Sequence, residues 1–177
     1  NKMYLFGYMM HRFKNDSRAW VPYPMDDTPN HENDDSNGRS GKSLFVKALG
    51  TVKNLLILDG KDENLFKDNH VFEEVTLDTD MILVDDATKD FPIKRTFSLT
   101  TGDLKMNPKG TKRATIPFDL APKLSITTNF ALDQDSASAK DRGFFAGCSK
   151  YYNFDAERKT WNERGPPIGD VGKELFK

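Results

Sequence analysis

A glycine- and serine-rich segment, Ser36-Asn-Gly-Arg-Ser-Gly-Lys-Ser43, has the residue types of a loop that binds phosphate. Glycine lets the backbone approach phosphate oxygens closely, and consecutive N–H groups at the start of a helix can surround an anion. Lys42 would place a cation on the β- and γ-phosphates of a nucleotide, and the Ser43 hydroxyl would bind Mg²⁺. We therefore predict a site for ATP and Mg²⁺ formed by Asn37, Gly38, Arg39, Ser40, Gly41, Lys42 and Ser43.

The segment has the spacing of a Walker A loop except at its first residue, where Ser36 replaces the usual glycine. A side chain at that position can crowd the first turn of the loop. The N–H groups that would bind phosphate lie mostly in residues 38–43, and an apolar helical pattern follows them. The alternative is a glycine- and serine-rich loop that has this spacing by chance.

Two carboxylates follow a short apolar run, Met81-Ile-Leu-Val84, that is typical of a buried strand. Ligands of parallel sheets gather at the carboxyl ends of strands, where Asp85 and Asp86 are expected. Asp85 would hold Mg²⁺ together with Ser43, and Asp86 would activate the attacking water. A solvated turn is the alternative for an isolated Asp-Asp pair, but its place downstream of Lys42 favours the Walker B role.

The rest of the chain supplies elements that could position these residues. Three apolar runs predict fully buried strands, at Leu55–Leu58, Met81–Val84 and Leu124–Thr128. The intervening helical patterns favour a parallel sheet with helices on its faces. Helices are predicted from Tyr4 to about Asn15, after Ser43, and over Phe91–Leu99 with Gly102 as its end. A hairpin is predicted over Leu104–Phe118 with Asn107-Pro-Lys-Gly110 at its turn.

Two segments before the phosphate loop are predicted to lie outside the central sheet. Pro22 and Pro24 reduce the apolar run that begins at Trp20 to an edge strand at best. Residues 26–35 carry five acids and no Lys or Arg, which predicts a solvated loop.

The overall charge excludes a uniformly basic protein that coats DNA. The 177 residues contain 26 Lys and Arg against 27 Asp and Glu, a net charge of −1, so any contact with nucleic acid must be local. The single Cys148 cannot form an internal disulfide, and no apolar run reaches the roughly 18 residues of a membrane-spanning helix. We expect a cytoplasmic protein without membrane contact. The length predicts one domain over residues 1–177, and the start at Asn1 suggests a piece of a longer chain.

The predicted hairpin concentrates positive charge. Lys105, Lys109, Lys112 and Arg113 occur in nine residues without an acid. Basic side chains on a turn suit the phosphates of single-stranded DNA, which supply affinity without reading sequence. A solubilising turn is the alternative.

The order of these motifs resembles that of the superfamily 3 helicases of small DNA viruses, phages and plasmids. The phosphate loop is followed by Ile-Leu-Val-Asp-Asp86, then by Leu99-Thr-Thr-Gly-Asp103 through Lys112-Arg113, which looks like motif B′. Asp119-Leu-Ala-Pro-Lys-Leu-Ser-Ile-Thr-Thr-Asn129 looks like motif C, and the resemblance covers roughly 60% of the chain, to Arg142. It implies an AAA+-like P-loop NTPase: a three-layer sandwich with a mainly parallel sheet and an inserted basic hairpin.

The resemblance also assigns two further residues and several partners. Asn129 would sense the γ-phosphate or the attacking water, and Arg142 would act as an arginine finger in the site of a neighbouring subunit. Without the resemblance, Asn129 is a capping residue and Arg142 a surface partner of Asp141. The family forms rings, usually hexamers, that move 3′-to-5′ on single-stranded DNA, in some cases fused to a primase. A phage or plasmid replication protein, in a bacterial or phage-infected host cell, is the implied setting.

The predicted function is therefore an ATP-dependent DNA helicase motor. Two alternatives stay open: a P-loop ATPase that acts as a loader or switch without moving on DNA, and a scaffold that binds nucleotide without hydrolysis. The serine at position 36 keeps the scaffold open.

Overall fold

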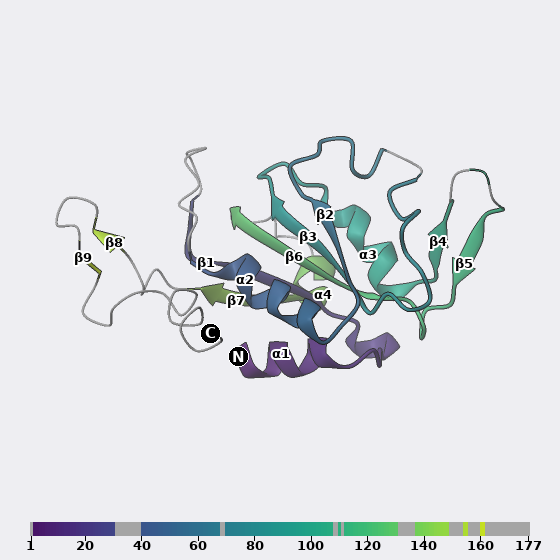
Figure 1. Ribbon diagram of the computed structural model, residues 1–177, viewed down its shortest axis with the longest axis horizontal. Coiled ribbons are helices and arrows are strands. Elements are labelled where there is room, and N and C mark those ends of the chain that lie inside the picture. Colours follow the sequence, from purple (N-terminus) through teal and green to yellow (C-terminus); the bar gives the residue numbers. More distant parts are fainter. Residues whose placement is uncertain are drawn as a thin grey trace.

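The chain folds around one parallel five-stranded sheet (Figure 1). The computed structural model describes residues 2–30, 40–67, 70–107, 110, 112–130, 137–148, 154–155 and 160–161. The strands pair in the order β2-β3-β6-β1-β7, and every pair is parallel. Their bounds are β1 Val21–Asn30, β2 Leu55–Asp59, β3 Met81–Ala87, β6 Lys123–Phe130 and β7 Gly143–Cys148. The predicted α/β class with a mainly parallel sheet is confirmed.

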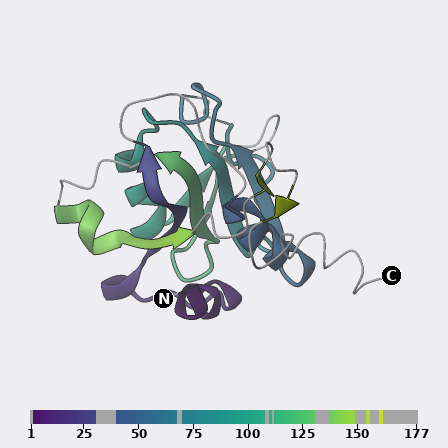
Figure 2. The ribbon, with the colours of Figure 1, turned by 90° about the vertical axis from the view of Figure 1, so that its left-hand side faces the viewer.

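Helices cover both faces of the sheet, which gives three layers (Figure 2). They are α1 Lys2–Met10, α2 Lys42–Lys47, α3 Ile93–Thr101 and α4 Ala137–Arg142, with 3₁₀ turns at Asp16–Arg18 and Ala48–Thr51. Side chains alternate along a strand, so Met81 and Leu83 of β3 pack with α1 and α2, whereas Ile82 and Val84 pack on the side of α3. No helix in the described ranges is long and apolar enough to cross a membrane.

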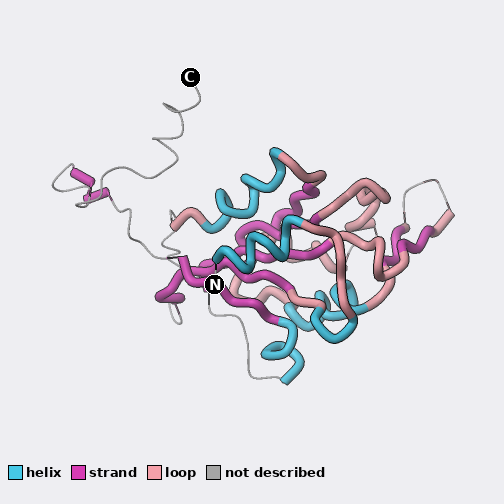
Figure 3. The backbone as a smooth tube through the Cα atoms, turned by 90° about the horizontal axis from the view of Figure 1, so that it is seen from below, coloured by secondary structure: helices cyan, strands magenta, loops and turns pink. Residues whose placement is uncertain are grey.

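A small hairpin stands apart from the central sheet. Its strands, β4 Leu104–Met106 and β5 Ala114–Ile116, pair antiparallel, as predicted. Figures 1 and 3 show that it projects from the body of the protein. The hairpin connects the end of α3 to the start of β6, so its base lies near the amino ends of the parallel strands. The predicted turn is only partly described, because Pro108, Lys109 and Thr111 lie outside the described residues. A second short pair joins β8 Phe154–Asp155 to β9 Thr160–Trp161.

The prediction of an edge strand at Val21 is wrong. β1 lies between β6 and β7 and pairs continuously with β7 from Val21 to Asp26. A proline removes only its own N–H donor, so Pro22 and Pro24 leave the other backbone groups available. Val21 and Tyr23 are almost fully buried, and this apolar burial favours an interior position. The pairing of β1 with β6 is less regular, with a register shift between Met25 and Asn30.

The solvated loop predicted from Asp26 is also partly wrong. Residues 26–30 continue β1, and Asp26 is 3% exposed. Residues 31–35 lie outside the described part of the chain. The sequence pattern of acids and breakers is typical of a loop, but the position of Asp26 beside a buried cation allows it to be buried.

Two other predictions were correct in type and wrong in extent. Leu55–Leu58 forms β2, but β2 is an edge strand with Ile57 47% exposed, not a fully buried strand, because it has only β3 beside it. The first helix ends at Met10, and Asn15 instead caps the 3₁₀ turn by accepting a hydrogen bond from Ser17 N. The helix predicted before Gly102 is confirmed as α3.

Candidate functional site

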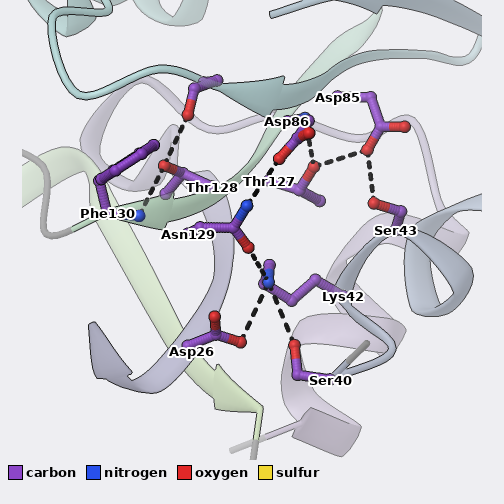
Figure 4. A network of polar contacts seen from close by, with 11 residues as sticks. Asp26, Ser40, Lys42, Ser43, Asp85, Asp86, Thr127, Thr128, Asn129 and Phe130 are labelled. Atoms are coloured by element: carbon purple, nitrogen blue, oxygen red, sulfur yellow. Dashed lines mark hydrogen bonds and ion pairs between the residues drawn. The ribbon is translucent and has the colours of Figure 1, made fainter. Parts of the chain in front are cut away.

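Five residues from three segments meet at the carboxyl ends of β1, β3 and β6 (Figure 4). Lys42 and Ser43 begin α2, Asp85 and Asp86 lie near the end of β3, and Asn129 lies near the end of β6. Because β6 lies between β1 and β3, Asn129 lies between the phosphate loop and the two aspartates. The structure therefore brings together five of the residues for which the sequence predicts nucleotide chemistry.

The backbone before Lys42 needs a glycine. Gly41 has φ +81°, a left-handed conformation that side chains rarely adopt. Its carbonyl accepts a hydrogen bond from Phe45 N at 2.9 Å, which closes the first turn of α2. This turn directs Lys42 inward. Of the other predicted loop residues, Ser40 is described and contacts Lys42, whereas Asn37, Gly38 and Arg39 lie outside the described residues.

Lys42 is a buried cation with three acceptors. It is 6% exposed, and its Nζ donates to Asp26 Oδ1 at 3.0 Å, Ser40 Oγ at 3.1 Å and Asn129 Oδ1 at 2.5 Å. A buried charge needs an opposite charge and hydrogen bonds to be tolerated. Asp26 supplies the charge and the two other residues supply the remaining acceptors, so the ammonium is held in one place.

Asp85 is surrounded by donors. Ser43 Oγ and Thr127 Oγ1 donate to its Oδ1 at 2.6 and 2.7 Å, and Lys47 Nζ lies 2.6 Å from its Oδ2. Burial by itself raises the pKa of Asp85, but the hydrogen bonds from Lys47, Ser43 and Thr127 outweigh it and lower the pKa below its usual value. Asp85 is therefore a carboxylate at neutral pH.

The donor set fits a magnesium ion that is shared with a substrate. Mg²⁺ prefers oxygen ligands and is commonly bound through one or two protein oxygens together with substrate phosphates. The Ser43 hydroxyl and the Asp85 carboxylate supply two such oxygens side by side. No group of three or more His, Cys, Asp or Glu within the described ranges forms a metal cage. Ser43 and Asp85 would hold the ion, and Lys47 would have to release Asp85 in part.

Asp86 has an unusual backbone. Its φ is +60°, and the pairing of β3 with β6 is interrupted between Val84 and Ala87. Residues other than glycine rarely adopt this conformation, and such strain gathers at functional sites. The Asp86 N–H donates to Thr127 Oγ1 at 2.9 Å. The bulge turns the Asp86 side chain away from Asp85, so two neighbouring carboxylates have separate surroundings.

The Asp86 carboxylate is held from two sides. Asn129 Nδ2 donates to its Oδ1 at 2.9 Å, and Lys61 Nζ lies 2.6 Å from its Oδ2. The ion pair raises the pKa of Lys61 above its usual value. Asp86, Asn129 and Lys61 also line a cavity of about 890 Å³ that opens beside the site. A water in that cavity would have direct access to the Asp86 carboxylate.

Two sets of predicted residues are not brought to this site. Arg142 is the last residue of α4 and precedes the amino end of β7, so it lies at the opposite end of the sheet from Lys42. No ion pair joins it to Asp141 in the described ranges. Its guanidinium carbon lies 5.4 Å from the centre of the Phe97 ring, and its buried Nε has no hydrogen-bond partner there. The hairpin residues Lys105, Lys112 and Arg113 also lie away from the site, and Lys109 is outside the described residues.

Four residues of the site were not predicted from the sequence: Asp26, Lys47, Lys61 and Thr127. Lys47 lies on α2 one helical turn after Ser43, a spacing that places both side chains on one face. Lys61 follows the end of β2, and the rule that ligands gather at strand ends could have indicated it. Thr127 lies within the motif C resemblance. Asp26 had no such signal.

Comparisons with known proteins indicate a shared fold. No family model matches the sequence, and no curated protein matches it. One similar solved structure is a JCV helicase with a bound small molecule, at 15% identity and a TM-score of 0.48 over 83% of this chain and 40% of that one. Another is the C-terminal region of NrS-1 in an apo form, at 15% identity and a TM-score of 0.51 over 82% of this chain and 33% of that one. The chain thus spans less than half the length of either protein, and the likeness to NrS-1 shows the fold alone.

Proposed function

We propose that the chain is an ATP-hydrolysing motor domain of superfamily 3 helicase type. The observation that supports this best is the meeting of Lys42, Ser43, Asp85, Asp86 and Asn129 at one end of the sheet. A cation for phosphate, a serine–aspartate pair for Mg²⁺ and a second carboxylate for water are the parts that phosphoryl transfer to water requires. The order of sequence motifs supplies the helicase part of the proposal.

The surroundings of each residue support a role in this proposal. Lys42 neutralises charge on the β- and γ-phosphates, from a position fixed by its three acceptors. Ser43 and Asp85 hold Mg²⁺, which would supply charge neutralisation on the phosphates when bound. Asp86 accepts the proton of the attacking water from the side of the cavity. Asn129 orients Asp86 and contacts Lys42. It therefore connects the residue that would activate water with the residue that would bind phosphate.

A ring would give Arg142 a role in the site of a neighbouring copy. Because Arg142 stands at the end of the sheet opposite Lys42, it cannot contact the phosphate bound by its own chain. A second copy would bring an Arg142 to each site, where a guanidinium stabilises the charge of the transition state by on the order of 10³-fold or more. A homo-oligomeric ring, hexameric as in the family, is part of the proposal.

Single-stranded DNA is the proposed nucleic acid on which the motor moves. Lys105, Lys112 and Arg113 are on the described part of a projecting hairpin, and in a ring of copies these hairpins would converge. Phosphate contacts of this kind hold DNA without sequence preference. A replication protein of a phage or plasmid, with a primase domain or partner, is the setting that the resemblance supports.

The test is ATP turnover with and without single-stranded DNA, measured together with the oligomeric state. We expect DNA-stimulated turnover in the wild type and a loss of at least about 100-fold in Lys42→Ala. Lys2→Ala, which removes an exposed lysine of α1 outside the cavity, is the matched control and should match the wild type. Turnover without stimulation would favour a loader or switch.

A second variant separates hydrolysis from binding. Asp86→Asn keeps the size of the side chain but removes the base, so turnover should fall by about 10²–10⁴-fold while nucleotide affinity changes little. Binding of ATP by the wild type without any turnover in the presence of DNA would favour the scaffold. A folded wild type that binds no nucleotide would contradict the proposal.

A further inference from the structure

Asp26 is the least expected charge in the protein. It is 3% exposed and lies on β1, where it is paired in register with Cys148 of β7. Its Oδ1 accepts a hydrogen bond from Lys42 Nζ at 3.0 Å, and this is the only ion pair of Asp26 within the described ranges. Removing a carboxylate from water is costly unless a cation compensates it. Asp26 and Lys42 therefore compensate each other's buried charge.

The ammonium of Lys42 has no donor to spare. A lysine has three N–H donors, and the three acceptors of Lys42 are Asp26, Ser40 and Asn129. A phosphate oxygen can therefore receive a hydrogen bond from Lys42 only if one of these contacts is broken or shared. Asp26 is the one acceptor with a full negative charge, so it is the partner that an anionic ligand replaces charge for charge.

We propose that Asp26 is an internal counter-ion that competes with nucleotide phosphate for Lys42, and that it thereby weakens nucleotide binding. The proposal rests on the proposed function of Lys42. Asp26 supplies the negative charge beside Lys42 and holds the ammonium in place. A nucleotide must offset the loss of this contact before it gains anything from Lys42.

Either outcome of the competition makes nucleotide binding less favourable. If Asp26 leaves Lys42, its carboxylate stays buried without a cation, which is unfavourable. If Asp26 keeps its contact, its negative charge lies beside the phosphates in a site of low dielectric constant, which is also unfavourable. In either case, removal of the charge on Asp26 should tighten binding. A purely structural role predicts something different: lower stability with unchanged affinity.

The experiment compares nucleotide dissociation constants of the 177-residue chain and its variants, measured by calorimetry with Mg-ADP. Asp26→Asn keeps the size and one acceptor but removes the charge, and it should bind at least about tenfold more tightly than the wild type. Asp78→Asn is the matched control, because it removes one exposed carboxylate near the amino end of β3, away from the site, by the same substitution. It should stay within about twofold of the wild type.

The possible results are distinct. Asp26→Asn affinity equal to or weaker than wild type overturns the inference. If the wild type nevertheless binds and Lys42→Ala does not, the proposed function survives that result. Binding by Asp26→Asn alone would support the inference strongly. No binding by the wild type or by either Asp→Asn variant overturns both proposals.

Two further measurements guard against a variant that does not fold. Asp26→Ser keeps a hydroxyl acceptor without charge and should also tighten binding. In the wild type, the carboxyl carbon of Asp26, observed by ¹³C NMR, should shift on addition of Mg-ADP because its contact with Lys42 changes. An unchanged signal under saturating nucleotide would overturn the inference without any substitution.

Discussion

The two ends of the parallel sheet both bury lysines, but they compensate the charge differently. At the carboxyl end, Lys42 has an aspartate and two neutral acceptors within hydrogen-bond distance. At the amino end, Lys14 is 7% exposed and its Nζ has no hydrogen-bond partner among the described residues. Its Nζ lies 4.6 Å from the centre of the Phe118 ring. Burial and the nearby charge of Arg12 lower the pKa of Lys14 to about 8.

Lys123, the first residue of β6, is a second buried lysine at the amino end of the sheet. It is 2% exposed, and its Nζ donates to the Tyr8 carbonyl and lies 3.7 Å from the centre of the Tyr8 ring. Burial first, and then the charges of Lys14 and Lys53, lower its pKa to about 7. The difference teaches that a buried lysine is paired with a carboxylate where we propose anion binding. Elsewhere it is accommodated by becoming a weaker base.

The largest expected effect is the loss of stimulation by DNA when the basic residues of the hairpin are removed. Replacing Lys109, Lys112 and Arg113 together by alanine should abolish the stimulation of ATP turnover by single-stranded DNA and leave basal turnover unchanged. The physical reason is loss of phosphate contacts far from the site that hydrolyses ATP. The measurement is turnover against DNA concentration at low salt. The control with the same charge change replaces three exposed basic residues outside the hairpin and the cavity: Lys2, Arg18 and Lys94. If the hairpin variant is still stimulated by DNA, the proposed role of the hairpin in DNA binding is wrong.

A smaller effect concerns the backbone at the carboxyl end. A Cβ at Gly60 would lie 2.6 Å from Ala87 Cα and 2.7 Å from the Asp85 carbonyl oxygen, both backbone atoms that cannot move independently. Gly60→Ala should therefore lower the free energy of unfolding by about 1–3 kcal/mol. Gly7→Ala is the contrast, because nothing lies within 4 Å of a Cβ there and alanine favours α1 by about 0.5–1 kcal/mol. Urea unfolding of both variants checks the pair. Equal effects would mean that the two regions are packed alike.

The last prediction concerns the pH dependence of stability at the amino end. The pKa of Lys123 is lowered from 10.5 to about 7 on folding, so between these values the unfolded chain binds the extra proton and stability rises with pH. Below about pH 7 both states are protonated and this contribution has no slope. Lys123→Met should remove the slope, so its stability relative to the wild type should be greatest at pH 6 and decline towards pH 9. Urea unfolding at three pH values tests this, with Lys2→Met as the control. Parallel curves for wild type and Lys123→Met would contradict the lowered pKa.

The spacing of the phosphate loop predicted Lys42 and Ser43, the end of a buried strand predicted Asp85 and Asp86, and the family resemblance added Asn129. Lys42, Ser43, Asp85 and Asn129 each adjoin the end of an element, and parallel strands bring such ends to one edge. The class of fold followed from the same apolar runs. The chemical roles of these residues stay predictions until nucleotide binding is measured.

What the sequence could not supply depends on neighbours that are distant along the chain. The exposed edge of β2 follows from strand order, which an apolar run does not encode. The interior position of β1 depends on its pairing with β7, more than one hundred residues later. Asp26 lies in a segment whose composition is typical of a loop, and its burial makes sense only beside Lys42. Lys61 meets Asp86 because β2 and β3 pair in register up to Asp59 and Asp85.

The two contacts of the Asn129 side chain fix the orientation of its amide group. Its oxygen points at an ammonium and its nitrogen points at a carboxylate, so the amide dipole lies along the field between Lys42 and Asp86. Reversing the amide would place donor against donor and acceptor against acceptor. One of two orientations is thereby selected before any ligand arrives. A dipole that is already aligned needs no reorientation when charge develops in a reaction, which is the property that makes a polar site effective.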